Sequence, residues 1–358
     1  MKMTFRYGWM LSLLLVLMFA STAAAQDMDA MCESVGLSPA DCEIYMLATS
    51  TQVNSVQFDL DLAFAYEGSM FGDDPIHMAV VGSLAYDPDK LSALYEDTDA
   101  LSVQSVQEAI AAVNTRLDVA LDIPEWIRYD APELPGRLRM GLALVDSVGY
   151  VELSDLHLLD PENIPSGWYG LDIRPFIPVI FGSEADLFQM QPGESPSATY
   201  TYPFVEGVDI VRLPDVTIEG RTAAVFQTDV DYEQFMNSIL DTFIDAYTQQ
   251  GMTREQALAQ MDMLTSLLGQ MQASFIQIVD VENGYTYTYQ MEFDMPVSNE
   301  TFEALYGTGY DTGLDGMRMT MTIELRGHNE TGPAVAPQGA ELIPFTEIMP
   351  LLLGQQSS

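Results

Sequence analysis

Strict alternation of apolar and polar residues is the strongest pattern in this chain. Over residues 56–66 every second residue is apolar, and the same pattern recurs over 285–295 and 317–325. Successive side chains of a strand point to opposite faces, so these segments are predicted to be strands with one apolar and one polar face. That arrangement is typical of an antiparallel sheet that packs on one side only.

Shorter segments of the same character predict further strands of one meander. Asn283-Gly284 is a preferred pair for a two-residue hairpin turn, and it joins a strand over 274–282 to the strand over 285–295. The other predicted strands cover residues 77–86, 137–145, 149–153, 167–173, 216–219 and 223–230. Few segments depart from this pattern, so the sheet is expected to dominate the fold.

Helical periodicity is concentrated late in the chain. Two predicted helices, 231–249 and 253–271, are separated by Gly251 and each carries one apolar stripe. The stripes consist of Phe235, Ile239, Phe243 and Tyr247 in the first helix, and of Leu258, Met261, Leu264 and Leu268 in the second. Shorter helices are predicted near 90–95 and 103–113.

The first 25 residues predict a signal peptide. Lys2 and Arg6 precede a short apolar run, and the alanines up to Ala25 fit cleavage before Gln26. The mature chain is therefore expected to be secreted or periplasmic, with no membrane-spanning segment. Without the two leader cations, 13 − 2 = 11 basic residues face 53 acidic ones, a net charge of −42. Such a charge disfavours nucleic acid as a partner.

Two cysteines lie ten residues apart just after the leader. An extracytoplasmic compartment favours a disulfide between Cys32 and Cys42. Ser38-Pro39 before Asp41 is typical of a helix start, with serine as the N-cap and proline in the first turn. The disulfide is thus predicted to join two short helices into a stapled hairpin.

No residue pattern indicates catalysis. His77, His157 and His328 lack metal-ligand spacing, the serines lack a nucleophile-elbow context, and no glycine loop is suited to phosphate. We therefore expect no enzyme activity, no catalytic residue, no metal site and no cofactor.

Three short segments resemble a known family. The segments 149–151 (GYV), 167–172 (GWYGLD) and 337–344 (PQGAELIP), behind a leader, are similar to the lipoprotein-carrier superfamily, which includes LolA and the LppX/LprG-type lipid-binding lipoproteins. The resemblance implies an unclosed antiparallel β-barrel folded around helices, with a hydrophobic cavity between sheet and helices. The chain departs from the LppX/LprG type because it lacks a lipobox cysteine.

Together these observations predict an α+β fold. A large curved antiparallel sheet, an unclosed half-barrel wrapped around helices, is preceded by the stapled hairpin. The expected divisions are a signal peptide over 1–25, the hairpin over 26–50, the LolA/LppX-like domain over 51–348 and a flexible tail over 349–358.

Two functions are compatible with this prediction. In the first, the protein carries or senses a lipid acyl chain or another hydrophobic molecule in a cavity. The candidate pocket residues are Phe58, Leu60, Leu62, Tyr287, Tyr289, Met291, Met317, Met319, Met321, Phe235, Ile239, Phe243, Met261 and Trp168. In the second, the chain is a non-catalytic structural or interaction module, and the same apolar faces only fill a core. Methionine suits both, because it lines adaptable pockets and fills core gaps equally well.

The charge excess generates a first prediction. Mutual repulsion among the acidic side chains should destabilise the mature fold at low ionic strength, and added salt should screen it. We expect the melting temperature to rise as sodium chloride is raised from about 10 mM to about 150 mM. A flat or falling curve in differential scanning calorimetry would show that the acidic residues are already neutralised by partners.

Overall fold

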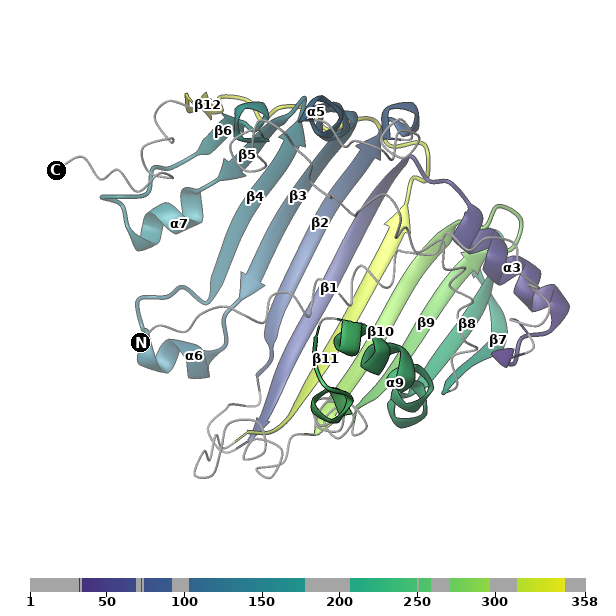
Figure 1. Cartoon of the computed structure of the whole chain (residues 1–358). Coiled ribbons are helices and arrows are strands. Elements are labelled where there is room, and N and C mark those ends of the chain that lie inside the picture. The colour runs from purple at the N-terminus through teal and green to yellow at the C-terminus, as the bar shows by residue number, and fades with distance from the viewer. Residues whose placement is uncertain are drawn as a thin grey trace.

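One broad, curved sheet dominates the structure (Figure 1). The computed structural model describes residues 32, 34–68, 72, 74–91, 103–177, 207–249, 251–258, 271–296 and 314–344. The strands of the sheet are β1 (Ser55–Gly68), β2 (Ile76–Tyr86), β3 (Val113–Asp122), β4 (Arg137–Val145), β5 (Val148–Glu152), β6 (Trp168–Asp172), β7 (Val208–Ile218), β8 (Arg221–Asp231), β9 (Gln272–Asp280), β10 (Thr286–Pro296), β11 (Leu314–Arg326) and β12 (Glu341–Leu342).

The chain builds this sheet from the middle outwards and then from the far edge back. The strand order is β12-β6-β5-β4-β3-β2-β1-β11-β10-β9-β8-β7. All neighbours are antiparallel except β12 and β6, which pair in parallel through two residues. Strands β7 and β12 lie at opposite ends of the order, so the sheet is not closed into a barrel. The predicted fold class, an unclosed and mainly antiparallel sheet behind a disulfide-stapled segment, is confirmed.

The described helices are short apart from one. They are α3 (Pro39–Ser50), α5 (Val103–Ala112), α6 (Glu125–Asp130), α7 (Ser154–Leu159) and α9 (Tyr232–Gln249), with a 3₁₀ turn, η1, at Arg174–Phe176. In Figure 1, α3 lies at the β7–β8 end of the sheet, whereas α6 and α7 lie towards the other end. Within the described ranges no helix has the length and apolarity needed to cross a membrane.

The stapled hairpin forms as its sequence predicts. Ser38 is the N-cap of α3 and its hydroxyl accepts the backbone N–H of Asp41, while Pro39 occupies the first turn. Cys32 lies in a helical turn before α3 and is disulfide-bonded to Cys42. The disulfide therefore closes the hairpin covalently.

The hairpin packs on one end of the sheet, on the face that carries Phe58, Leu60 and Leu62 in the central strand. We call this the apolar face, and the opposite one, with Asp59 and Asp61, the polar face. The buried cluster beneath the hairpin contains Cys32, Leu37, Cys42, Ile210, Ala224, Phe226 and Val279. Its four sheet residues come from β7, β8 and β9, so α3 covers the apolar face only at that end.

Two strands differ from the sequence prediction. Strand β3 was not predicted, although Val113, Leu117 and Leu121 alternate with polar residues as in the predicted strands. Of β7, the sequence predicts only residues 216–219 as a strand, and Pro214, an unfavourable strand residue, lies in the part that it misses. The register shifts between Leu213 and Val216, and this irregularity accommodates the proline in an edge strand.

Several predicted elements lie outside the described residues: the signal peptide, the tail over 349–358, most of the helix over 253–271 and the end of the helix over 90–95. Of the helix over 253–271, residues 254–258 are helical. They share a buried cluster with α9 that contains Ile244 and Ala257, packed against Phe235, Leu240, Tyr247 and Leu258. Phe235 and Tyr247 of the first predicted stripe thus share a cluster with Leu258 of the second.

Uneven burial along the apolar face generates a second prediction. Phe226, beneath the hairpin, is 0% exposed, whereas Phe64 on β1 is only half-buried. We expect Phe226→Ala to lower the free energy of unfolding by about 3–5 kcal/mol, the usual cost of a core cavity. Phe64→Ala should lower it by at most about 2 kcal/mol, because folding removes less of the Phe64 side chain from water. Urea unfolding of both variants measures this difference. Equal losses would mean that the central strands form a closed core.

Candidate functional site

The candidate site is the apolar face of the central strands. Directly paired residues of antiparallel strands lie on the same face, so the pairing can be followed from strand to strand. The row through Leu60 runs from β4 to β7 as Met140, Val119, Val80, Leu60, Ile323, Tyr289, Gln277, Phe226 and Arg212. The next row is Leu138, Leu121, Met78, Leu62, Met321, Met291, Phe275, Thr228 and Ile210. The apolar face is therefore continuous across nine strands.

The middle of this face is only half-buried. Phe58, Leu60 and Leu62 of β1, like Met319 and Met321 of β11, all retain partial exposure. Val80 and Met291 nearby are more deeply buried, at 9% and 8% exposed. In a fold of two packed layers, a sheet buries its apolar face against the second layer. Here the described residues bury the β7–β9 end better than the centre.

The register brings most of the predicted pocket residues together. Seven of them lie on the apolar face of β1, β10 and β11: Phe58, Leu60, Leu62, Met291, Met317, Met319 and Met321. Met291 pairs directly with Met321 across β10 and β11. Tyr289 belongs to the same face and is 38% exposed. These side chains form one surface of flexible thioether and aliphatic groups.

Tyr287 leaves this surface. A register shift between Thr286 and Thr288 interrupts the alternation of β10, so Tyr287 does not continue the row of Tyr289. Its hydroxyl instead donates to the carboxylate of Asp280 at 2.9 Å. Burial and the hydrogen bond to ionised Asp280 raise the pKa of Tyr287 to about 12. The alternation in the sequence gives no signal for this irregularity.

Asp280 is the centre of a turn rather than a reactive group. Its side chain is 1% exposed and accepts the backbone N–H groups of Glu282 and Asn283. Burial acts to raise the pKa of Asp280, but the hydrogen bonds outweigh it and hold that pKa below its usual range. His328 stacks on Tyr285 with ring centroids 4.8 Å apart, and its Nε2 lies 2.8 Å from the carbonyl oxygen of Thr286. Burial lowers the pKa of His328. Asp280, Tyr285 and His328 together stabilise the β9–β10 turn.

Trp168 lies on the polar face, apart from the other pocket candidates. The row Tyr169, Val151, Leu142, Leu117, Gly82 and Phe58 is on the apolar face. Adjacent Trp168 must therefore point to the polar face. Its ring covers Gly141 of β4 and lies under the guanidinium of Arg116, whose Cζ is 5.6 Å from the ring centroid. The predicted strand is confirmed. Trp168 itself packs on Gly141 and Arg116 and does not belong to the apolar face.

The helical candidates are only partly placed. Phe235 packs in the cluster between α9 and residues 254–258. The side chains of Ile239 and Phe243, and the whole of Met261, lie outside the described residues. The prediction that these helices roof the apolar face therefore stays a prediction.

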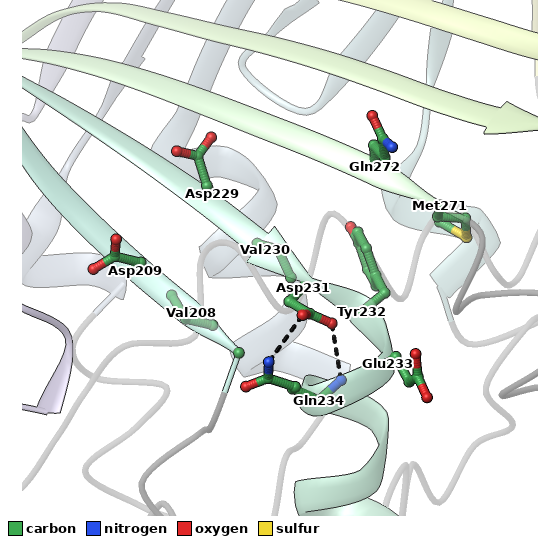
Figure 2. Close-up of a pocket in the computed structure, with 11 residues that line it drawn as sticks. Val208, Asp209, Asp229, Val230, Asp231, Tyr232, Glu233, Gln234, Met271 and Gln272 are labelled. Carbon is green, nitrogen blue, oxygen red and sulfur yellow. Dashed lines mark hydrogen bonds between the residues drawn. The ribbon is translucent and has the colours of Figure 1, made fainter.

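A cavity of about 690 Å³ lies where β8 passes into α9. Apolar Val208, Val230 and Met271 contribute to its lining, together with the carboxylates of Asp209, Asp229, Asp231 and Glu233. Figure 2 shows Asp231 bonded to Gln234, whose backbone N–H and side-chain amide both donate to it. The cavity is at one end of the apolar face, next to the ends of β7–β9, and not over β1.

The other two histidines, His77 and His157, are held by neighbours. His77 on the polar face contacts Asp61 at 2.9 Å and Asp122 at 3.4 Å, and His157 lies 2.5 Å from the carbonyl oxygen of Ile164. In the described part of the chain, no group of three or more His, Cys, Asp and Glu side chains is arranged to hold a metal ion.

The contact between Trp168 and Gly141 generates a third prediction. A methyl group at Gly141 would overlap the indole ring, so Gly141→Ala should destabilise the fold by about 1–3 kcal/mol. In a Trp168→Leu background the same substitution should cost less, because the overlap is gone. Urea unfolding of the two single variants and the double variant measures the coupling. Additive losses would contradict the packing described above.

Comparisons with known proteins return the groups that the sequence resembles. No protein-family model matches the chain, and no curated protein is similar to it. The chain is similar to LprF from Mycobacterium bovis over 83% of its own length and 97% of that chain, with 8% identity and a TM-score of 0.28. The similarity to lipoprotein LppX from Mycobacterium tuberculosis covers 87% of this chain and 100% of that one, with 8% identity and a TM-score of 0.26. The similarity to a LolA superfamily protein from Nitrosomonas europaea covers 86% of this chain and 95% of that one, with 8% identity and a TM-score of 0.16. With TM-scores this low, the fold rests on the strand order and register described above.

Proposed function

We propose that this protein is an extracytoplasmic binding protein that carries or senses a lipid or other hydrophobic molecule between its sheet and its helices. The observation that carries the proposal is the half-burial of the apolar face at the central strands. Large contiguous apolar surfaces are rare on soluble monomers unless they bind something. A hydrophobic ligand on this face would remove from water the surface that the described residues leave exposed.

The composition of the face supports a ligand of variable shape. Met291, Met317, Met319 and Met321 present thioether side chains with three rotatable bonds from two paired strands. Such side chains adapt to ligands of different outline at low cost. The disulfide between Cys32 and Cys42 supports an oxidising compartment, as does the predicted signal peptide cleaved near Ala25 and Gln26.

The cavity volume is compatible with this function. Small-molecule sites usually enclose roughly 300–1,000 Å³ with mostly apolar walls. The cavity at the start of α9 has about 690 Å³, and its apolar residues Val208 and Val230 belong to the same face as Met319. In the alternative function, a structural or interaction module, other parts of the chain cover this face as an ordinary core.

A fourth prediction tests the proposal. We expect organic extraction and mass spectrometry of the purified protein to yield co-purifying lipid or another hydrophobic molecule. The delipidated protein should bind the uncharged dye Nile red with an increase in fluorescence. Met319→Trp should weaken dye binding at least about ten-fold, because the indole fills part of a ligand site without overpacking a core.

Thr320→Trp is the matched control. Thr320 is the next residue of β11, is exposed and lies on the polar face, so the same indole there should leave dye binding unchanged. Two results together would overturn the proposal: no dye binding by the wild type, and destabilisation of Met319→Trp by about 1–3 kcal/mol, the usual cost of overpacking. The apolar face would then be core.

A further inference from the structure

The basic residues of the mature chain are few, and the structure places all of them. After Lys2 and Arg6 of the leader, the chain contains one lysine and ten arginines, and each lies in a described range. The lysine and arginine side chains around the apolar face can therefore all be located.

Five arginines of the sheet lie on the polar face. They are Arg116, Arg137, Arg139, Arg318 and Arg326, all in register with the polar residues of β1 or its neighbours. Arg326 pairs with Asp59, Arg318 contacts Glu67 at 3.1 Å, and Arg137 contacts Asp122 at 3.6 Å. None of the five can reach through the sheet to a ligand on the other side.

Arg212 is the single basic residue on the apolar face of the strands, and its charge is already balanced. Its guanidinium lies against the ring of Phe226, with Cζ 5.1 Å from the centroid. It contacts the carboxylate of Asp41 on α3 at 3.1 Å and also pairs with Asp215. Two carboxylates thus face one cation beneath the hairpin, and no net positive charge is left there.

The other basic residues lie on helices, turns and strand ends. Lys90, Arg174 and Arg221 pair with Asp87, Asp172 and Asp280 respectively. Arg128 of α6 donates to the carbonyl of Ile123, and Arg254, at the start of the helical segment 254–258, is exposed. Helix α9 contains no lysine or arginine.

Apart from Arg212, the polar side chains on the apolar face of the strands are uncharged. Tyr289 and Gln277 are neighbours in the row through Leu60, and the Gln277 amide donates to the hydroxyl of Thr286 at 3.0 Å. The hydroxyl of Tyr289 accepts from the Gln277 amide and donates to the Thr286 hydroxyl, both at 3.4 Å. Because both contacts are long, the hydroxyl can exchange one of them for an uncharged polar group of a ligand. The cavity at the start of α9, at the end of β7–β9, is lined by four acidic residues and by no basic residue.

We infer that the site takes uncharged hydrophobic molecules and rejects amphiphiles with an anionic head group. This inference rests on the proposed function. A carboxylate or phosphate placed against the apolar face would lose its water and find no cation to replace it, and removing an unpaired charge from water is strongly unfavourable. An alcohol, ester or ketone carries a far smaller penalty and has Tyr289 as a hydrogen-bonding partner.

The experiment compares two ligands that differ only in the head group. Nile red bound to the delipidated protein is displaced at pH 8 by 1-decanol or by decanoate, below the concentration at which either forms aggregates. We expect decanol to bind at least ten-fold more tightly than decanoate. Equal displacement, or tighter binding of decanoate, would overturn the inference while leaving the proposed function intact. If neither the dye nor decanol binds, the proposed function itself fails.

High salt separates the local cause from the charge of the whole protein. At about 1 M sodium chloride the screening length falls to roughly 3 Å, so repulsion by distant acidic residues is cancelled. The missing cation on the apolar face is not replaced by salt, and the preference for decanol should persist. Loss of the preference in high salt would overturn the inference, because the net charge would then explain it.

A matched pair of variants supplies the missing charge. Met321→Lys places an ammonium group on the apolar face, and it should bring the affinity for decanoate to within about three-fold of that for decanol. Thr320→Lys adds the same charge one residue away on the polar face and should leave the ten-fold preference unchanged. Equal effects of the two lysines would contradict a local origin. If Met321→Lys does not fold by circular dichroism, the pair Met319→Lys and Thr320→Lys makes the same comparison.

Discussion

The structure depends on one constraint: apolar side chains stay in register across a single sheet that is not closed. The rows through Leu60 and Leu62 run from β4 to β7, and each paired residue must keep its face for the row to remain continuous. A slip of one residue in any strand would move its apolar side chains to the polar face. A face this wide requires a cover, and the described residues supply a tight one only at the β7–β9 end.

The N-terminal hairpin is that cover, and its attachment combines several independent interactions. Its disulfide limits the hairpin to few conformations, and Tyr45 packs edge-on against Phe226 with centroids 5.3 Å apart. The backbone N–H of Ile210 on the edge strand β7 donates to the carbonyl of Val35, which satisfies part of that edge. Arg212 then ties α3 to the sheet through Asp41. The hairpin therefore closes one end of the sheet in two ways, by burying its apolar face and by occupying its edge.

The sequence predicts what is local and misses what depends on pairing between distant segments. Alternation identifies β1, β10 and β11 and their two faces, and Ser38-Pro39 identifies the start of α3, because these signals reside in consecutive residues. Trp168 shows the limit. The alternation states that Trp168 and Tyr169 point to opposite faces, but only the pairings from β6 to β1 determine which of the two shares a face with Phe58.

The predicted face of Tyr287 and the predicted bounds of β7 are wrong for a related reason. An inserted residue in β10 and an irregularity at Pro214 in β7 each interrupt the alternation of faces at one position. The interruption in β10 is accommodated by the hydrogen bond from Tyr287 to Asp280, and the one in β7 by the position of this strand at the edge of the sheet. The shared face of the candidate residues on β1 and β11 is predictable from the sequence, because these strands pair without a shift from Gln57 to Glu67.

The same separation of faces explains how a strongly acidic chain can keep an uncharged surface. The polar face places arginines beside carboxylates of neighbouring strands, as in Arg318 with Asp294 and Glu67, so part of the repulsion is offset where the strands pair. Exposed pairs of this kind contribute little stability each, typically about 0–1 kcal/mol. Their larger effect is on placement, because every sheet arginine used on the polar face is absent from the other side. The one arginine of the apolar face, Arg212, is already paired with Asp41 and Asp215, so this face has no free cation to neutralise an anionic ligand. The surplus of acids elsewhere keeps the molecules apart in solution. The alternation of apolar and polar residues along the strands thus places most charged side chains on one side of the sheet and the apolar side chains on the other.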